Sequence, residues 1–421
     1  MTAGGDPTPA ASPRPRRPAT IDGIETSTPV VVLSAQNYGS LGIIRSLGRL
    51  RIPVYAVDAD PRRPASYSRY LRGRFRFDVA TATADATVDY LTGVAKKLGS
   101  RAVLIPTWDE TARLASEAYD VLSEHFLLPD QPDNLAFSLS SKKEMHRLAK
   151  RDSIPTPDVT FPSGVEDVRA FADKAAFPVM LKGIDGNRLK RRTGRKMEIV
   201  ADPDALVRLY QEMEDLTDPN LMLQEYIPGG DDSIWMFNGY FDANSDCLAS
   251  FTGRKLRQTP PYTGVTSLGV CLRNDVVEQT TRQWMKRLGY RGILDIGYRY
   301  DARDGSYKVL DVNPRIGATF RLFVAKNGLD VVRALYLDLT GQPVPVSEQV
   351  DGRKWLVEGG DFDSFLRYRR EGKLTTRRWV ASLAGVRETA YFAADDLKPF
   401  LGVCSEFFRR KARAAGREQS V

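Results

Sequence analysis

The chain is poor in the residues on which several common kinds of site depend. Its 421 residues include only two histidines and three cysteines. Cys247, Cys271 and Cys404 show no CxxC spacing, which argues against a disulfide framework or a zinc site. Two histidines also exclude mechanisms built on several imidazoles. The apolar runs are too short to span a bilayer, and the N-terminus lacks the apolar core of a signal peptide, so we expect a cytoplasmic protein.

Charged residues are abundant but unevenly placed. The chain is 42% hydrophobic and 27% charged, which allows sizeable cores in two to four domains. The net charge of +8 could favour nucleic acid, but much of the excess lies near Arg14, in residues 188–196 and after Phe407, without a nucleic-acid motif. We therefore expect no nucleic-acid partner. The basic residues 405–414 could contact a membrane surface weakly, although a solvated helix explains them more simply.

The N-terminal third has the pattern of an α/β domain. Residues 1–28 are rich in Pro, Ala, Thr and Gly and should form a disordered tail. PVVVLSA then predicts a buried strand, NYGSLGIIRSLGRL a helix and IPVYAVDAD a second strand, which make a parallel βαβ unit. RAVLIP and residues 107–126 repeat the strand and helix. Asp109 and Glu110 follow that strand, where open α/β sheets place ligands, or they simply favour the start of the helix.

A βαβ unit raises the alternative of a dinucleotide site. Asp58 stands at the end of the second strand, where an acidic residue would bind ribose hydroxyls. Gly39 and Gly42 form GxxG rather than GxGxxG, so the fingerprint is incomplete. An NAD(P)-dependent oxidoreductase stays an alternative for this reason, as does a nucleotide-binding protein without catalytic activity.

The most informative stretch is RGILDIGYRYDARDGSYKVLDVNPRIGATFR, residues 291–321. β-branched and aromatic residues on both sides of an Arg-Asp-Gly-Ser turn predict a β-hairpin. Asp295, Asp311 and Asn313 share odd parity, so a hairpin loop with an odd number of residues would place all three on one face. These oxygen ligands suit Mg²⁺, which often also binds nucleotide phosphates, and Arg315 could clamp a phosphate oxygen. Taken singly, each of these residues is also common in turns and at the ends of strands.

LDVNPRIG resembles the signature of the ATP-grasp superfamily, whose members bind ATP and Mg²⁺ between two α+β lobes and mostly join a carboxylate to an amine. GRKLRQTPP and YRYDARDG look similar to a carboxylate-amine ligase group that includes carbamoyl-phosphate-synthase-like proteins. The resemblance implies a combined α/β and α+β fold class. It further implies a Rossmann-like pre-grasp domain at 29–138, a first lobe at 139–227, a second lobe with the metal site at 228–345, and a small extension without assigned chemistry at 346–421.

The same resemblance implies two lysines at the nucleotide phosphates. Lys142, near the start of the helix in SSKKEMHRLAKRD, fits the first position better than Lys143 does. Lys182 ends the buried strand FPVMLKG and matches the second lysine, and a charge there needs an anionic partner. The family's glycine-rich loop is replaced by GIDGNRLKRRTGRKMEIV, which looks closer to the D-aspartate ligase branch. There Lys196 and Arg195 are candidates to reach the nucleotide, and a solvated basic loop is the alternative.

Between the lobes, the family recognises adenine and ribose through a connector, here LMLQEYIPGGDD. Asp232 corresponds to the acidic residue that accepts the ribose hydroxyls, although Asp231 is close enough to compete for that role. The candidate adenine-binding residues of the connector are Gln224, Glu225, Tyr226 and Ile227.

Three cations in FTGRKLRQTPP lie near the expected phosphate site. Arg254 and Lys255, together with Arg315, are the candidate catalytic residues, because cations stabilise the charge that develops on a transferring phosphoryl group. Arg257 is the third cation of this stretch. A basic edge strand protected against aggregation is the alternative.

These residues together predict a ligase that depends on ATP and Mg²⁺ or Mn²⁺. It would activate a carboxylate as an acylphosphate and join it to an amine, releasing ADP and phosphate. The expected partners are a small-molecule carboxylate and amine, with a homodimer as one assembly to consider. The sequence departs from the family at Gly297, on the same face as Asp295, and in the long spacing to Asp311. Asp295 is therefore the least secure metal ligand.

Overall fold

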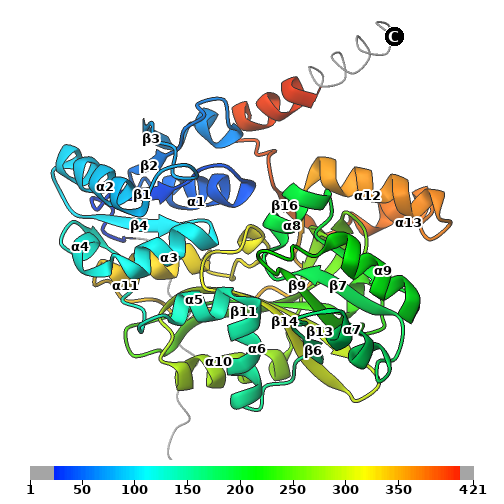
Figure 1. The fold of residues 1–421 in the computed structure, drawn as a ribbon. Helices are drawn as coiled ribbons and strands as arrows, with labels where there is room; N and C mark the ends of the chain where they lie inside the picture. Colours follow the sequence, from blue (N-terminus) through cyan, green and yellow to red (C-terminus); the bar gives the residue numbers. More distant parts are fainter. Residues whose placement is uncertain (1–22, 408–421) are drawn as a thin grey trace, which may run out of the picture.

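Three β-sheets organise the chain in this computed structural model, which describes residues 23–407 (Figure 1). A five-stranded sheet occupies the N-terminal third, a four-stranded sheet follows, and a seven-stranded sheet is built from the remainder. The architecture is a mixed α/β fold, as the sequence predicts. No helix within the described residues is long and apolar enough to cross a bilayer.

The five-stranded sheet is parallel, in the order β3-β2-β1-β4-β5. The strand β1 is buried along its whole length because its alternate residues enter two different cores, one on each face of the sheet. The single helix predicted over 107–126 is two helices that meet at Ala118. The elements are β1 (Val30–Leu33), α1 (Tyr38–Gly48), β2 (Val54–Val57), η1 (Pro64–Tyr67), β3 (Leu71–Phe75), α2 (Ala84–Leu98), β4 (Ala102–Pro106), α3 (Asp109–Glu117), α4 (Tyr119–Ser123) and β5 (Phe126–Leu127).

Residues 23–28 run along the helix α11 (Val331–Leu339). Ile24 packs against the core, and the Tyr336 hydroxyl lies within hydrogen-bonding distance of the carbonyls of Glu25 and Thr28, at 3.3 and 3.1 Å. The expected disordered tail was therefore wrong for residues 23–28. The rest of that tail lies outside the described residues, as do residues 408–414 of the expected basic helix.

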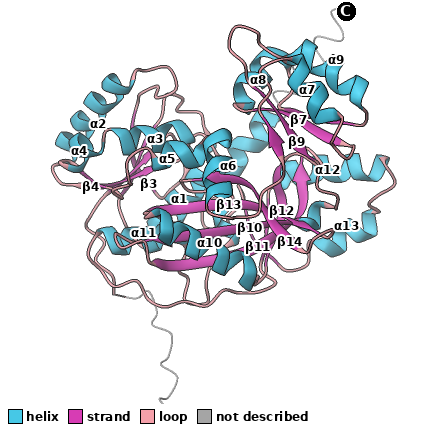
Figure 2. Cartoon of the chain, turned by 60° about the horizontal axis from the view of Figure 1, so that its bottom comes forward, coloured by secondary structure: helices cyan, strands magenta, loops and turns pink. Residues whose placement is uncertain are grey.

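The four-stranded sheet has the order β6-β9-β7-β8 and is antiparallel. Two helices, α7 and α9, cover one face through the apolar side chains Val179, Leu181 and Leu223. The other face carries Met180, Lys182, Met222 and Gln224. Figure 2 shows this sheet and its helices standing apart from the five-stranded sheet. The elements are β6 (Val159–Thr160), α7 (Val165–Ala172), β7 (Val179–Gly183), α8 (Gly186–Thr193), β8 (Met197–Val200), α9 (Pro203–Met213) and β9 (Leu221–Glu225).

The seven-stranded sheet has the order β14-β13-β10-β11-β12-β15-β16. Phe237 and Tyr298 share a core with α5, α6 and α10 on one face, whereas Met236 and Tyr240 meet α11 and the N-terminal domain on the other. The elements are α5 (Leu135–Ser140), α6 (Lys142–Arg151), η2 (Asp231–Ser233), β10 (Ile234–Phe241), β11 (Cys247–Thr259), β12 (Val265–Cys271), α10 (Asp275–Leu288), β13 (Gly292–Asp301), β14 (Ser306–Asn313) and η3 (Phe320–Leu322).

The C-terminal extension is part of this sheet rather than an appendage. Its strands β15 (Lys354–Leu356) and β16 (Val386–Thr389) continue the sheet beyond β12. The helices α12 (Glu358–Arg370) and α13 (Thr376–Ser382) follow β15. Arg257 of β11 donates to both carboxylate oxygens of Asp361 on α12, at 2.7 and 2.9 Å, so α12 is anchored to the sheet by a buried ion pair.

Candidate active site

The hairpin of β13 and β14 brings the three predicted metal ligands to one face. Asp295 lies directly opposite Asn313, and Gly297 lies opposite Asp311, so all three polar side chains point to the same side. The turn between the paired residues Asp301 and Ser306 has an even number of residues, so the expected odd-length loop was wrong. A β-bulge between Val309 and Asp311 supplies the missing shift of one residue.

Asp295 is the most confined of these ligands. Burial raises the pKa of its carboxyl to about 6, the charge of Asp311 adds to this, and Arg315 and Lys255 oppose it. The amide of Asn313 donates to Asp295 Oδ2 at 3.2 Å. A Cβ on Gly317 would lie 2.5 Å from Asp295 Cγ, so glycine is required behind this carboxylate.

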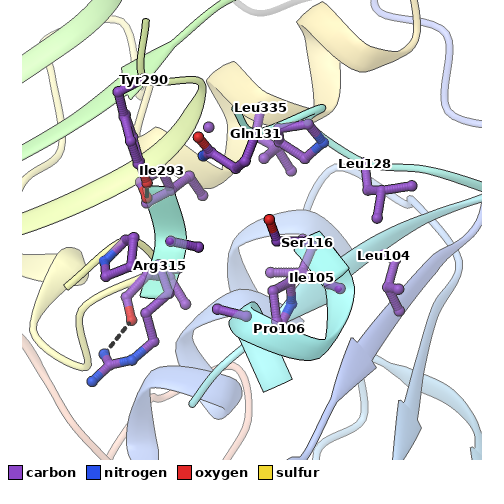
Figure 3. A pocket seen from close by; sticks show the side chains of 17 residues that line it. Leu104, Ile105, Pro106, Ser116, Leu128, Gln131, Tyr290, Ile293, Arg315 and Leu335 are labelled. Atoms are coloured by element: carbon purple, nitrogen blue, oxygen red, sulfur yellow. Dashed lines mark hydrogen bonds between the residues drawn. The ribbon is translucent and has the colours of Figure 1, made fainter. Parts of the chain in front are cut away.

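Arg315 joins the hairpin to the N-terminal domain. Its Nε donates to Asp109 Oδ1 at 2.6 Å and its Nη2 to Asp109 Oδ2 at 3.2 Å, while Nη2 also donates to Asn313 Oδ1 at 3.1 Å. Asp109 thus starts α3 at the end of β4 and also belongs to the site. Figure 3 shows Arg315 beside a small apolar cavity of about 60 Å³, its guanidinium pointing away from lining residues such as Ile105 and Ile293.

The lysines of the four-stranded sheet and α6 face this hairpin. Lys182 is only 7% exposed, and its pKa is lowered to about 7 by burial and then by Lys142, while the charge of Asp311 acts in the opposite sense. The Lys142 ammonium donates to the carbonyls of Gly183 and Ile184, at 3.1 and 2.7 Å. The structure thus brings Lys142 beside the end of β7.

The basic stretch that replaces the family's glycine-rich loop after Lys182 contains the helix α8. Asp185 caps its start by accepting from the backbone of Asn187 and Arg188, and Gly194 ends it with a φ of +76°. Lys196 follows the helix and is largely exposed, but partial desolvation of its ammonium, together with the charges of Lys190 and Lys142, lowers its pKa. Arg195 of this stretch is already paired, since it donates to Glu212 at 2.8 Å. Lys143 on α6, the second candidate for the first phosphate lysine, lies with its ammonium 5.8 Å from the centre of the Phe161 ring.

The connector residues differ in how far their side chains are already engaged. Gln224 lies opposite Met180, on the same face of the sheet as Lys182, and its Oε1 is buried without a hydrogen-bond partner. The Glu225 carboxylate accepts from Arg303 and lies 3.4 Å from Lys308, both on the hairpin, so it is already paired. Tyr226 packs under Arg299, with 5.7 Å between guanidinium and ring, and Ile227 is buried.

The two neighbouring residues Asp231 and Asp232 differ in the exposure and the hydrogen-bond partners of their carboxylates. Asp232 is exposed. Asp231 is partly buried, and accepts from Gln258 Nε2 at 2.8 Å and from the hydroxyl of Tyr368 on α12. Asp232 therefore keeps a free carboxylate for a ligand, while Asp231 is tied to the C-terminal extension.

Arg254 and Lys255 are neighbours on β11 but face opposite sides of the sheet. Lys255 shares the face of Asp295, and its ammonium donates to Gln258 Oε1 at 3.2 Å and to the carbonyl of Gly264 at 3.1 Å. Burial lowers its pKa to about 8, against the charges of Asp295, Asp231 and Asp311. Arg254 pairs across the strands with Trp235 and lies 5.9 Å above its ring, so the register does not bring Arg254 to the face of Asp295.

The chain is 25% identical over 243 residues to the D-aspartate ligase of Enterococcus faecium, a stretch that is 55% of this chain and 57% of that protein. The chain therefore spans little more than half the length of this curated relative. A scan against protein-family models finds no match.

Solved structures share the fold at low identity. The biotin carboxylase of Campylobacter jejuni, in a complex described as beta-gamma-ATP, is 15% identical with a TM-score of 0.60, covering 77% of this chain and 74% of that one. N5-carboxyaminoimidazole synthase of Aspergillus clavatus, with ADP bound, is 14% identical (TM-score 0.56; 76% and 79%), and L-amino acid ligase of Bacillus licheniformis is 13% identical (TM-score 0.56; 78% and 79%). The chain thus shares its fold with these enzymes and part of its sequence with a D-aspartate ligase.

The structure shows two buried polar groups near Lys182 that the sequence did not single out. His146 lies one helical turn after Lys142 on α6; its Nδ1 has no hydrogen-bond partner, and its pKa is lowered to about 4 by burial and by Lys182 and Lys150. Thr156, in the loop after α6, is buried and its hydroxyl is unpaired. The spacing of His146 from Lys142 was the one available signal.

The structure also bears on the alternative of a dinucleotide site at the N-terminal βαβ unit. A Cβ on Gly39 would lie 2.9 Å from Ala318 Cα, and one on Gly42 would lie 2.9 Å from Phe320. The two glycines of the GxxG turn therefore permit close packing of α1 against the segment that follows the hairpin. That segment covers the start of α1, where a dinucleotide pyrophosphate would have to lie.

Proposed function

We propose that the chain is an ATP-dependent ligase that activates a substrate carboxylate as an acylphosphate and joins it to an amine, releasing ADP and phosphate. The observation that carries the proposal is the position of Asp311. It shares a sheet face with Asp295 and Asn313, and its charge acts on Lys182 of the four-stranded sheet. One site thus combines ligands suited to Mg²⁺ with a cation suited to phosphates. The likeness to named ligases supports the same class of reaction.

Three buried polar atoms without hydrogen-bond partners indicate whether a nucleotide fits beside the four-stranded sheet. Gln224 Oε1, His146 Nδ1 and Thr156 Oγ1 are all buried and unpaired. Such a group costs on the order of 1–3 kcal/mol, so it usually has a partner in the working protein. Lys182 lies on the same sheet face as Gln224, and the charge of Lys182 acts on His146. A nucleotide, which carries hydrogen-bonding edges and phosphates, fits these needs.

The donor set of the hairpin fits Mg²⁺. Asp295 and Asp311 offer two carboxylates and Asn313 an amide, and Mg²⁺ usually takes only one or two protein carboxylates beside waters and phosphates. Among residues 23–407, no group of three or more His, Cys, Asp or Glu side chains is arranged to hold a metal, so phosphate oxygens and waters would complete the coordination. Bound Mg²⁺ would neutralise charge on the phosphates.

The residues of the chain would divide the remaining work. Lys182 and Lys142 hold the phosphates, with Lys142 exchanging its two carbonyl partners for phosphate oxygens. Arg315 and Lys255 hold the substrate carboxylate and stabilise the charge that develops during transfer. No protein nucleophile is needed, because positioning and charge neutralisation carry most of a phosphoryl transfer. Exclusion of water then protects the acylphosphate until the amine attacks.

The division into lobes is part of the same proposal. We assign residues 29–138 to a pre-grasp domain, 139–227 and 228–345 to the two lobes, and 346–421 to the extension. Asp232 accepts the ribose hydroxyls in this arrangement, and Lys196 approaches the phosphates from the end of α8. Glu225 shapes the connector through its ion pairs.

The test is ADP release measured across pools of carboxylates and amines. ADP and phosphate should form in proportion to amide only when both substrates are present, because the acylphosphate forms first and waits for the amine. With ¹⁸O in the carboxylate, one labelled oxygen must leave in the phosphate. Label in AMP, or in no phosphorus product while amide forms, would rule out this route. Binding of ATP without turnover in any pool would instead identify a nucleotide-binding protein without catalysis.

A further inference from the structure

The helix α12 of the C-terminal extension reaches the candidate active site through a chain of hydrogen bonds. The Tyr368 hydroxyl donates to one oxygen of Asp231, and Gln258 Nε2 donates to the other at 2.8 Å. Gln258 Oε1 then accepts from the Lys255 ammonium at 3.2 Å. This series of hydrogen bonds therefore begins at Tyr368 on α12 and ends at Lys255, whose ammonium lies on the same sheet face as Asp295.

The partners of Lys255 are themselves held by α12. The hydroxyl of Ser364, which is fully buried, donates to the backbone carbonyl of Gln258 at 2.6 Å. The second partner of Lys255 is the carbonyl of Gly264, in the loop 260–264 that joins β11 to β12. Tyr262 of that loop is covered by α12 and the residues after it, since its hydroxyl donates to Glu371 and its ring lies 4.5 Å from the ammonium of Lys373.

The attachment of α12 itself is rigid. The ion pair of Arg257 and Asp361 is almost wholly buried, and Trp379 Nε1 donates to the same carboxylate at 2.9 Å. A Cβ on Gly360 would lie 2.8 Å from Thr259 Cγ2, so the start of α12 lies against the end of β11 without room for a side chain. A tightly fixed helix can hold the end of β11 and its loop in one position.

We propose that α12 is a positioning element of the active site, which sets the place of the Lys255 ammonium through Tyr368, Ser364 and Gln258. The extension thereby gains a role beyond completing the sheet. This inference rests on the proposed function only where turnover is concerned, because the position of Lys255 is a property of the fold itself.

Two variants and a matched control test the proposal. Tyr368→Phe removes one hydroxyl and keeps the ring, and the double variant Ser364→Ala/Tyr368→Phe releases α12 from both bonds. The control is Tyr240→Phe, which removes a phenol-to-carboxylate bond of 2.6 Å to Asp338 on the same sheet, away from Lys255. All three are compared with the unmodified protein by thermal melting and by trace acetylation of Lys255, quantified by peptide mass spectrometry.

We expect acetylation of Lys255 to rise about threefold or more in both α12 variants and to stay unchanged in Tyr240→Phe, because only the α12 variants free the ammonium. Turnover should fall on the order of tenfold in the α12 variants, since small displacements of a positioning group are costly. Unchanged acetylation of Lys255 in both α12 variants would overturn the proposal. Absence of turnover in the unmodified protein would overturn the proposed ligase reaction but not the acetylation result.

Discussion

Two buried polar clusters in this molecule are built on opposite principles. The junction cluster, made of Arg321, Asp330, Glu388, Arg353 and Ser46, joins α1, η3, the start of α11 and β16. Its charges are paired: Arg321 donates to Glu388 at 2.8 and 2.7 Å and also to Asp330, and Arg353 donates to Glu388 at 2.7 Å. The Ser46 hydroxyl donates to Asp330 at 2.6 Å.

The site cluster, made of Lys182, Gln224, His146 and Thr156, contrasts with it. Lys182 is buried beside another lysine, and the other three residues each leave one buried polar atom unpaired. In the junction cluster, partners of opposite charge offset the cost of burying charged side chains. In the site cluster, the residues of the cluster itself do not offset that cost. Each charged residue of the junction cluster thus has a partner of opposite charge, although Arg353 Nε stays unpaired, whereas Lys182 in the site cluster is buried beside a like charge.

The largest effect should come from the hairpin. Asp311→Asn should lower turnover by about a thousandfold or more, because a neutral amide holds Mg²⁺ more weakly than the carboxylate it replaces and metal stabilisation of the transferring phosphoryl group is worth several kcal/mol. Nucleotide affinity should change far less, since Lys182 and Lys142 remain. Steady-state kinetics and calorimetric ATP titration check both. Asp246→Asn, at a surface carboxylate paired with Lys286, is the control, and an active Asp311→Asn protein would remove Asp311 from the metal site.

The junction cluster should respond in stability instead. Arg321→Met should lower the free energy of unfolding by about 3–5 kcal/mol, because it leaves Asp330 and Glu388 with uncompensated buried charge. Urea-induced unfolding measures the difference. Lys326→Met, which breaks an exposed pair with Glu348, should cost less than about 1 kcal/mol. Equal losses in the two variants would contradict the contrast between buried and exposed pairs.

Lys182→Ala should weaken ATP binding by about 10- to 100-fold, the worth of one hydrogen bond to a charged phosphate. The unfolding free energy should not fall comparably, since the ammonium has no anionic partner at contact distance among residues 23–407. ATP titration and urea unfolding on the same samples separate the two quantities. A large loss of stability with unchanged ATP affinity would place Lys182 with the junction cluster.

The pKa of Lys182, about 7, adds a pH dependence. Only the charged form of Lys182 binds phosphate well, and a bound phosphate raises the pKa of Lys182. Above pH 7, ATP binding is therefore coupled to the uptake of a proton by Lys182. ATP affinity should therefore be flat below pH 7 and fall up to about tenfold per pH unit above it. Lys182→Arg keeps its charge and should abolish this slope; a slope that persists in that variant must come from another group.

The smallest expected changes, in the free energy of unfolding and in ATP affinity, come from substitutions at two threonines. Thr156→Val removes an unpaired hydroxyl and should leave the unfolding free energy unchanged or raise it by up to about 1 kcal/mol, while lowering ATP affinity by a few fold. Thr281→Val should instead lower the free energy of unfolding by about 1–3 kcal/mol, because the Thr281 hydroxyl bonds to the Val277 carbonyl and to Tyr298, both at 2.7 Å. Thermal and urea unfolding, with ATP titration, decide between the two behaviours.

Local pattern predicted the hairpin, the βαβ unit and the lysine that ends β7. Alternation along a strand put Asp295, Asp311 and Asn313 on one face, although the β-bulge that makes this work has no sequence signal. The same alternation implies that Arg254 and Lys255, as neighbours on a strand, face opposite sides, so both could not serve one site. This inference was available from the sequence and was not drawn.

Contacts between distant segments were beyond prediction. Asp109 and Arg315 are 206 residues apart, and nothing in either segment specifies that they meet. The strands β15 and β16 have three and four residues, too few for a periodic pattern, so their place in the sheet depends on tertiary packing. The chain of contacts from Tyr368 to Lys255 depends in turn on that placement.

The ion pairs of Glu225 with Arg303 and Lys308 have a mechanical consequence. They tie the end of β9 to the tip of the hairpin, while the bonds of Lys142 to Gly183 and Ile184 tie α6 to the end of β7. If Lys142 turns from those carbonyls to a phosphate, the tie at Glu225 remains. The four-stranded sheet would then rotate about that corner as about a hinge, so its strand ends near Lys182 would travel farther than the connector does.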